Sequence, residues 1–242
     1  QDGGFDKLWK RLGDNKIKAD MIKAMNTNAS DWENLYYGSG GADNVLILGF
    51  RQDSLKKYVG KTLAQIAKIR GKSPEETAID LIRDDSSRVE VAYFMMNEDN
   101  VKKELALPWV SFGSDEGSYA TEGKFLTFNA HPRAYGTFAR VLGKYSRDEK
   151  VISLAEAIRK LSKLPATNLK LKNRGELKPG YFADIVIFNP DSIADHATFE
   201  KPHAYATGVM DVLVNGVQVI KDGEHTGNKP GRFIKGPGWK GK

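Results

Sequence analysis

An acidic residue in a glycine-bounded turn is the first candidate for chemistry in this 242-residue sequence. Asp115 lies within Phe112-Gly113-Ser114-Asp115-Glu116-Gly117, directly after the short apolar run 109–113. A carboxylate at the carboxyl end of a barrel strand can deprotonate a metal-bound water and pass the proton to a leaving amine. The same residues are also ordinary turn chemistry, in which an Asp caps the turn. Taken alone, Asp115 is thus a candidate general acid/base with a common structural alternative.

A second polar group follows in Asn129-Ala130-His131-Pro132-Arg133-Ala134-Tyr135-Gly136. Arg133 carries a planar fork of N–H donors that matches a carboxylate with two hydrogen bonds. His131 and Tyr135 add donors that can be oriented, whereas a surface ion pair is the simpler role for Arg133. The remaining histidines, His196, His203 and His225, have no metal-ligand spacing. We expect those three to lie in loops or at the surface.

The elements that must position these residues begin with helices. Apolar residues recur at steps of three and four over residues 5–26, which predicts one helix. The apolar residues from Thr62 to Arg70 predict a second helix. Ser73-Pro74-Glu75-Glu76 predicts the start of a third helix, because Ser caps, Pro fits the first turn and Glu closes a capping box. A short strand is expected at 45–48.

A strand, a helix and a second strand then follow in order. The strand covers 89–96, the helix 97–105 and the second strand 109–113, which is the arrangement of a parallel βαβ unit. Helices are predicted at 137–145 and 154–164. Asp115 would therefore follow directly on a barrel-type strand.

From Arg174 the sequence is rich in β-strand signals. Strands are predicted at 183–188, 209–214 and 217–221. Asn215-Gly216 between the last two is the strongest two-residue hairpin signal, and Asp222-Gly223 predicts another turn. An α/β region is thus followed by a β-rich segment.

Composition excludes several classes of protein and site. Hydrophobic residues make up 40% and charged residues 28%, as in ordinary globular proteins. The absence of cysteine excludes disulfides, Cys-ligated zinc and a thiol nucleophile within this chain. No run of about 18 apolar residues is present, so no membrane span is predicted. The net charge of +6 is scattered, apart from a Gly- and Pro-rich tail at 229–242 that we interpret as a solvated strap and not a nucleic-acid arm.

Several blocks, taken in order, resemble one family. They are Ser114-Asp115-x-Gly117, the run from His131 to Gly143, Leu154-x-x-Ala157-Ile158-Arg159-Lys160 with Leu164-Pro165-Ala166, the run from Arg174 to Phe188, and Ala197-Thr198-Phe199 with Val212-x-Val214-Asn215-Gly216. The sequence resembles the C-terminal half of the N-acyl-D-amino-acid deacylases (D-aminoacylases) of the amidohydrolase superfamily. The resemblance is strong over about 89–236 and loose over 1–88.

The resemblance implies a fold and a set of roles. It implies an α/β fold: the C-terminal part of a (β/α)₈ TIM-like metal-dependent hydrolase barrel, with part of a small β-sandwich. Residues 1–173 would belong to the barrel, with an inserted helical region at about 5–86, and 174–242 to the sandwich segment and tail. Asp115 matches the family's catalytic acid/base near the zinc and is a possible metal ligand. Arg133 matches the residue that holds the substrate's α-carboxylate, with His131 as an unassigned neighbour in substrate binding.

One departure from the family is serious. Its other zinc ligands, a His-x-His, a Cys and two later histidines, come from earlier barrel strands and have no counterpart here. The leading hypothesis is therefore one chain of a two-chain zinc deacylase for small-molecule N-acyl-D-amino acids, with the N-terminal half as its partner. Two alternatives stay open: a non-catalytic fragment or interaction subunit of the same fold, and a cyclic amidase similar to hydantoinases or dihydroorotases.

The first residue bears on processing and location. Gln1 in place of Met predicts a processed chain, which favours an extracytoplasmic site, periplasmic or secreted, over a cytoplasmic one.

Overall fold

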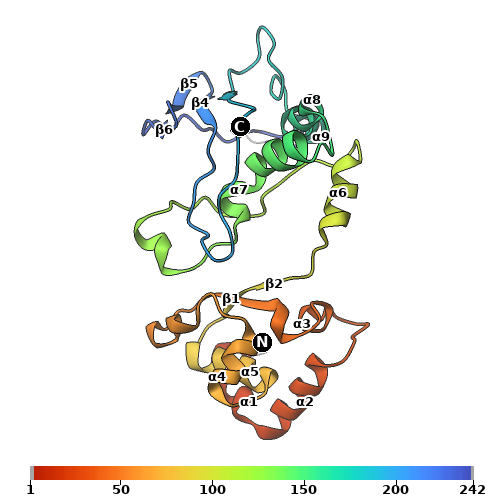
Figure 1. Cartoon of the computed structure of the whole chain (residues 1–242), viewed down its shortest axis with the longest axis vertical. Helices are drawn as coiled ribbons and strands as arrows, with labels where there is room; N and C mark the ends of the chain where they lie inside the picture. Colours follow the sequence, from red (N-terminus) through yellow and green to blue (C-terminus); the bar gives the residue numbers. More distant parts are fainter. Residues whose placement is uncertain (1–2, 241–242) are drawn as a thin grey trace. The chain divides into compact units, whose positions relative to one another are not determined.

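The chain forms two compact units (Figure 1). The structure is a computed structural model that describes residues 3–240, so Gln1, on which the expectation of a processed start rests, lies outside the described residues. Unit 1 comprises the chain up to Met96 together with Glu122–His131. Unit 2 comprises Asn97–Thr121 and the chain from Pro132 onward.

Unit 1 is mainly helical around one short antiparallel ladder. Its elements are α1 (Gly4–Gly13), α2 (Asn15–Met25), α3 (Leu35–Gly38), η1 (Ala42–Asn44), β1 (Val45–Gly49), η2 (Asp53–Tyr58), α4 (Leu63–Arg70), α5 (Pro74–Asp85), β2 (Glu90–Tyr93) and η3 (Gly123–Thr127). The predicted helix over 5–26 is divided in two. Asp14 is the reason, because its backbone is extended and its carboxylate caps the amides of Lys16 and Ile17.

The helix starts predicted at Thr62 and Ser73 are confirmed. Thr62 caps α4 and Ser73 caps α5, each in a reciprocal capping box with the residue three positions on. Between these helices Gly71 takes the left-handed conformation that ends α4. One apolar cluster, which includes Val45, Ile47 and Ile66, forms the core of this unit.

The parallel βαβ unit is not present. β2 pairs antiparallel with β1, with Val45 opposite Tyr93 and Ile47 opposite Val91. The prediction paired 89–96 with 109–113, but no strand forms at 109–113. A barrel strand needs a neighbouring strand for its backbone N–H and C=O groups. None pairs with 109–113 among the described residues, and Trp109 is 67% exposed.

Unit 2 combines helices with a four-stranded sheet. Its elements are α6 (Glu98–Ala106), α7 (Arg133–Arg140), η4 (Val141–Asp148), α8 (Leu154–Ile158), η5 (Arg159–Lys163), α9 (Leu164–Asn168), β3 (Ile185–Phe188), β4 (Val209–Val214), β5 (Val217–Lys221) and β6 (Glu224–His225). The helices predicted at 137–145 and 154–164 are confirmed as the runs α7–η4 and α8–η5–α9. Leu105, Val141, Tyr145 and Ala157 form the centre of its apolar core.

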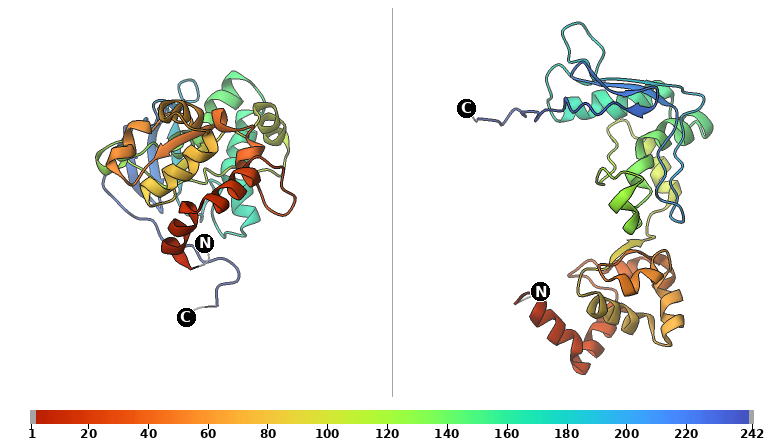
Figure 2. Two further views of the ribbon diagram at one scale, coloured as in Figure 1. Left: turned by 90° about the horizontal axis from the view of Figure 1, so that it is seen from below. Right: turned by 90° about the vertical axis from the view of Figure 1, so that its left-hand side faces the viewer.

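The sheet of unit 2 is a meander in the order β3-β4-β5-β6, antiparallel throughout. Asn215 and Gly216 both have positive φ at the β4–β5 turn, as the hairpin signal predicts. Beyond β6 the chain runs to its C-terminal end without further helix or strand among the described residues (Figure 2). No helix in the described part of the chain is long and apolar enough to cross a membrane.

Candidate active site

Asp115 stands in an exposed turn of unit 2. Its backbone is left-handed, with φ +49°, and its side chain is 95% exposed. Positive φ is energetically unfavourable for an L-residue, although Asp and Asn adopt it more readily than most. The turn therefore presents the carboxylate to solvent.

Arg133 is the first residue of α7, and its guanidinium lies against this turn. Its Nη2 donates to the backbone oxygen of Asp115 at 2.9 Å and lies 3.4 Å from the Asp115 carboxylate. The same nitrogen lies 3.5 Å from Glu116 Oε1. Two residues that lie 18 positions apart, predicted separately as acid/base and as carboxylate ligand, thus lie side by side. The guanidinium meets carboxylate groups of its own chain here, which is the ion pair given above as the simpler role for Arg133, and binding of a substrate carboxylate stays a prediction.

The far end of the same turn is held by two tyrosines. Tyr135, also on α7, donates its hydroxyl hydrogen to the backbone oxygen of Ala120 at 3.3 Å, and the Tyr205 hydroxyl accepts from the amide of Thr121 at 3.2 Å. Their rings meet edge to face with centroids 6.0 Å apart. Burial raises the pKa of the Tyr135 hydroxyl, and nearby Tyr205 adds to this rise. The turn from Asp115 to Thr121, which we call the Asp115 turn, is therefore anchored at both ends.

Tyr205 carries no signal in the sequence that could have singled it out. It lies in an irregular stretch, 70 positions from Tyr135 along the chain, and no spacing rule connects the two. His203, predicted as a loop residue, lies in a loop and packs its ring against Tyr135, with centroids 6.4 Å apart. The loop before β4 therefore belongs to the surroundings of Arg133.

The other histidines are dispersed. His131, predicted beside the substrate, is partly buried and belongs to unit 1, whereas Asp115 and Arg133 belong to unit 2. His196 is exposed, with Nε2 2.8 Å from the Thr207 hydroxyl. His225 is exposed in β6. The substrate-binding role of His131 stays a prediction.

Metal ligands do not gather in the described part of the chain. Within residues 3–240, no three His, Cys, Asp or Glu side chains are grouped so that they could hold a metal ion. Asp115 is close to the cation Arg133 and to no histidine cluster. The described residues therefore do not fit a complete zinc site, and a role for Asp115 as one ligand requires the remaining ligands from elsewhere.

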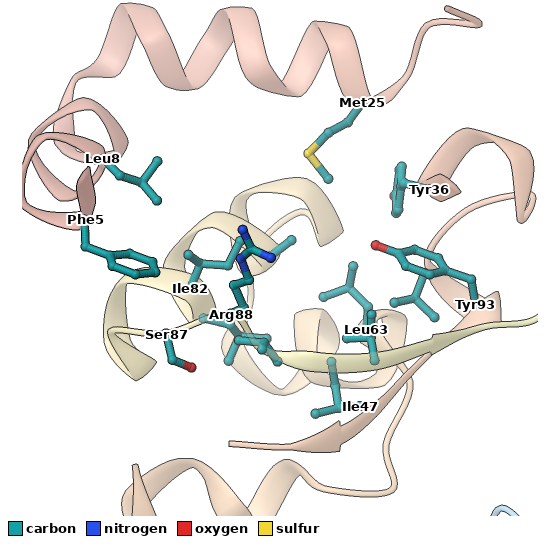
Figure 3. A pocket seen from close by; sticks show the side chains of 15 residues that line it. Phe5, Leu8, Met25, Tyr36, Ile47, Leu63, Ile82, Ser87, Arg88 and Tyr93 are labelled. Carbon is teal, nitrogen blue, oxygen red and sulfur yellow. The ribbon is translucent and has the colours of Figure 1, made fainter. Parts of the chain in front are cut away.

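An apolar cavity of about 270 Å³ lies apart from these residues, within unit 1 (Figure 3). Its walls come from α1, α2, α5 and the β1–β2 ladder, and Met25, Ile47 and Tyr93 are among the side chains that line it. None of Asp115, Arg133 and His131 lines it. The cavity is therefore a feature of the helical unit and not of the Asp115 turn.

A sequence profile described as "Amidohydrolase family" matches residues 13–220. This chain belongs to the amidohydrolase family. The D-aminoacylase of Alcaligenes xylosoxydans xylosoxydans is 39% identical over 175 residues, which cover 72% of this chain and 34% of that protein. This amidohydrolase chain thus spans about a third of the length of the curated relative.

Solved structures agree with the sequence match. One of them is a D-aminoacylase with a binuclear metal centre, for which one-metal activation and second-metal attenuation are described. It superposes on this chain with a TM-score of 0.67 at 32% identity, and the match covers 88% of this chain and 44% of that one. The N-acyl-D-glutamate deacylase of Bordetella bronchiseptica, in complex with zinc and a phosphonate mimic of the tetrahedral intermediate, gives 0.65 at 32% identity, over 76% and 36%. The α/β amidohydrolase fold of this chain is thereby shown.

Proposed function

We propose that this chain is the C-terminal part of a zinc-dependent N-acyl-D-amino-acid deacylase. Relatives with this activity in their names match most of the chain, and the observation that carries the proposal is the meeting of Asp115 and Arg133. In the whole enzyme, we expect 109–113 to form a strand of a (β/α)₈ barrel. We expect β3–β6 to form part of a β-sandwich.

The reaction proposed is hydrolysis of an open-chain amide. Water oxygen bonds to the amide carbonyl carbon, the C–N bond breaks, and the products are a carboxylate and a free D-amino acid. Asp115 accepts the proton from the attacking water and delivers it to the departing nitrogen. Its exposure suits this role, because a base must be within reach of the substrate.

Arg133 holds the α-carboxylate of the substrate in this proposal. Binding the carboxylate at a guanidinium next to Asp115 fixes the scissile amide relative to the acid/base, and such positioning lowers the entropic part of the barrier. In the free chain, Asp115 and Glu116 occupy the guanidinium. A substrate carboxylate would compete with Glu116 for the same donors.

The partner proposed is the N-terminal half of the enzyme as a second chain. It would supply the zinc ligands, since the described residues contain no group that could hold the ion. Mass spectrometry and metal analysis of the purified protein test this proposal. A second polypeptide and stoichiometric zinc are expected, and a single 26.9 kDa species without zinc would refute the two-chain arrangement.

The variant Asp115→Asn in the assembled enzyme tests the function itself. We expect hydrolysis of N-acyl-D-amino acids to fall by roughly 10²–10⁴-fold, the usual contribution of a general acid/base. Asp222→Asn is the matched control, because Asp222 is also exposed and also has positive φ, at the β5–β6 turn. Asp222→Asn should retain full activity. Unchanged hydrolysis in Asp115→Asn would show that Asp115 is structural.

A second candidate, a non-catalytic interaction subunit, is favoured by one observation. Among the described residues, no group of side chains could hold a metal ion. This candidate predicts that Asp115→Asn and the unaltered protein behave identically in every assay of hydrolysis, with the partner still bound.

A further inference from the structure

A buried lysine lies against the segment that leads to Asp115. Lys160, in η5, is 0% exposed. Its Nζ donates to the backbone oxygens of Leu105, in a short contact, and of Leu107, at 2.6 Å. The ammonium also lies over the ring of Phe112, 5.5 Å from its centroid. One side chain therefore contacts both ends of 105–112.

It is energetically unusual for a lysine side chain to be fully buried. Burial lowers the pKa of Lys160, and Glu156 one turn earlier partly opposes that change. A buried ammonium is costly unless its donors are satisfied. The two carbonyl oxygens at the end of α6 satisfy it, and such oxygens have no partner within their own helix. Their partial negative charge also favours a cation there.

A neighbouring arginine reinforces the same attachment. Arg159 Nη2 donates to the backbone oxygen of Pro108 at 2.6 Å, while its other contacts bind Glu156 on its own helix. Consecutive residues of η5 therefore bind three carbonyl oxygens within 105–108. Together with the backbone bond from the amide of Val110 to the oxygen of Leu107, at 3.2 Å, these side-chain bonds set the direction of the chain after α6.

We propose that Lys160 is a positioning residue for Asp115. It fixes the exit from α6 and the ring of Phe112, which packs on the apolar core of unit 2 three residues before Asp115. The Asp115 turn is anchored beyond this point by Arg133 and Tyr135. Lys160 thus sets where the turn begins. The inference rests on the proposed function of Asp115.

The test compares two lysines on one helix in the assembled enzyme. Lys160→Met keeps the stem and removes the donors, while Lys163→Met makes the same change at a residue that is 53% exposed and paired with Glu176 at 2.7 Å. For Lys160→Met we expect kcat to fall roughly 10- to 100-fold with KM within about twofold, because a displacement of about 1 Å has such an effect. Lys163→Met should match the unaltered enzyme.

Hydrogen exchange provides a readout that does not depend on activity. In Lys160→Met, the amides of 104–110 should exchange at least about tenfold faster, while those of β1 and β2 in unit 1 keep their rates. If Lys160→Met does not fold, Arg159→Gln and Lys160→Arg replace it. Arg159→Gln should show the exchange increase over 107–110 in weaker form, and Lys160→Arg, which keeps the positive charge, should retain part of the kcat of the unaltered enzyme.

The outcomes separate the two claims. Faster exchange with unchanged kcat, in an enzyme that Asp115→Asn inactivates, would overturn the positioning role and leave the function standing. Full activity of Asp115→Asn would overturn the function instead. Unchanged exchange over 104–110 in Lys160→Met would overturn the attachment itself.

Discussion

At the scale of single residues, the guanidinium of Arg133 invites a direct test of substrate recognition. If it binds an α-carboxylate, the enzyme should prefer an N-acyl-D-amino acid over the corresponding N-acyl-D-amino acid amide, in which an uncharged carboxamide replaces the α-carboxylate. Arg133→Lys keeps the charge and loses the planar fork, so kcat/KM for the acid should fall by roughly 10- to 100-fold, equivalent to about 1.5–3 kcal/mol for a charged hydrogen bond. Steady-state kinetics on both substrates measure the effect.

The amide substrate is the internal control for that prediction. Its kcat/KM should change far less in Arg133→Lys, because it has no carboxylate to lose. An equal loss on both substrates would mean that Arg133 only shapes the Asp115 turn, through its bond to the Asp115 backbone oxygen.

Residues of the site differ in how far the sequence could reveal them. Asp115 and Arg133 stand in local strings that together resemble one family, so the sequence was enough to name both as candidates, and their roles stay predictions. Tyr205 accepts a hydrogen bond from a backbone amide 84 positions away, and Lys160 donates to backbone oxygens 55 and 53 positions away. Such pairings depend on the tertiary fold and leave no local pattern in the sequence, so only the folded chain reveals them.

At the scale of elements, α2 is held to α5 by an ion cluster. Asp80 on α5 accepts hydrogen bonds from Lys72 and from Lys18 of α2, the latter at 3.1 Å. Burial alone would raise the pKa of Asp80, but the two ammonium groups outweigh it and lower the pKa. Because the folded pKa is the lower one, the stabilisation is present above about pH 4 and is lost as the pH falls through the folded value.

Asp80→Asn should therefore lower the free energy of unfolding by about 1–3 kcal/mol at pH 7. The difference from the unaltered chain should shrink as the pH falls below about 4, which urea unfolding at several pH values measures. Asp84→Asn on the same helix is the control, since the Asp84 side chain is half exposed and its pair with Arg70 should be worth less than about 1 kcal/mol. A pH-independent loss in Asp80→Asn would contradict the assignment.

The capping box of α5 yields a second prediction at this scale. Ser73→Ala removes the oxygen that accepts from the amide of Glu76. We expect a loss of about 1 kcal/mol in stability and a lower thermal midpoint. Ser118→Ala, at an exposed position outside any helix, should have almost no effect. Equal midpoints for Ser73→Ala and the unaltered chain would show that the cap is dispensable.

At the scale of the whole molecule, the predictions from local sequence patterns agree with the structure, whereas the predicted pairing of distant strands does not. Caps, turns and helical periodicity depend on neighbours within a few residues, which explains why α4, α5 and the Asn215-Gly216 hairpin agree with the sequence. A barrel strand depends on partners far away in the chain. The strand predicted at 109–113 lacks such partners among the described residues, and β2 pairs with β1 instead.

This difference makes Trp109 a reporter of the complete barrel. The residue is 67% exposed here, whereas a strand of a closed barrel is covered on both faces. Adding the N-terminal half should shift Trp109 emission to shorter wavelength and reduce its quenching by acrylamide several-fold. Because the chain has four tryptophans, the signal is taken as the difference between the unaltered protein and Trp109→Phe. Trp239→Phe in the tail is the control and should leave that change intact. An active, zinc-loaded assembly in which Trp109 stays as accessible as in the isolated chain would exclude a barrel strand at 109–113.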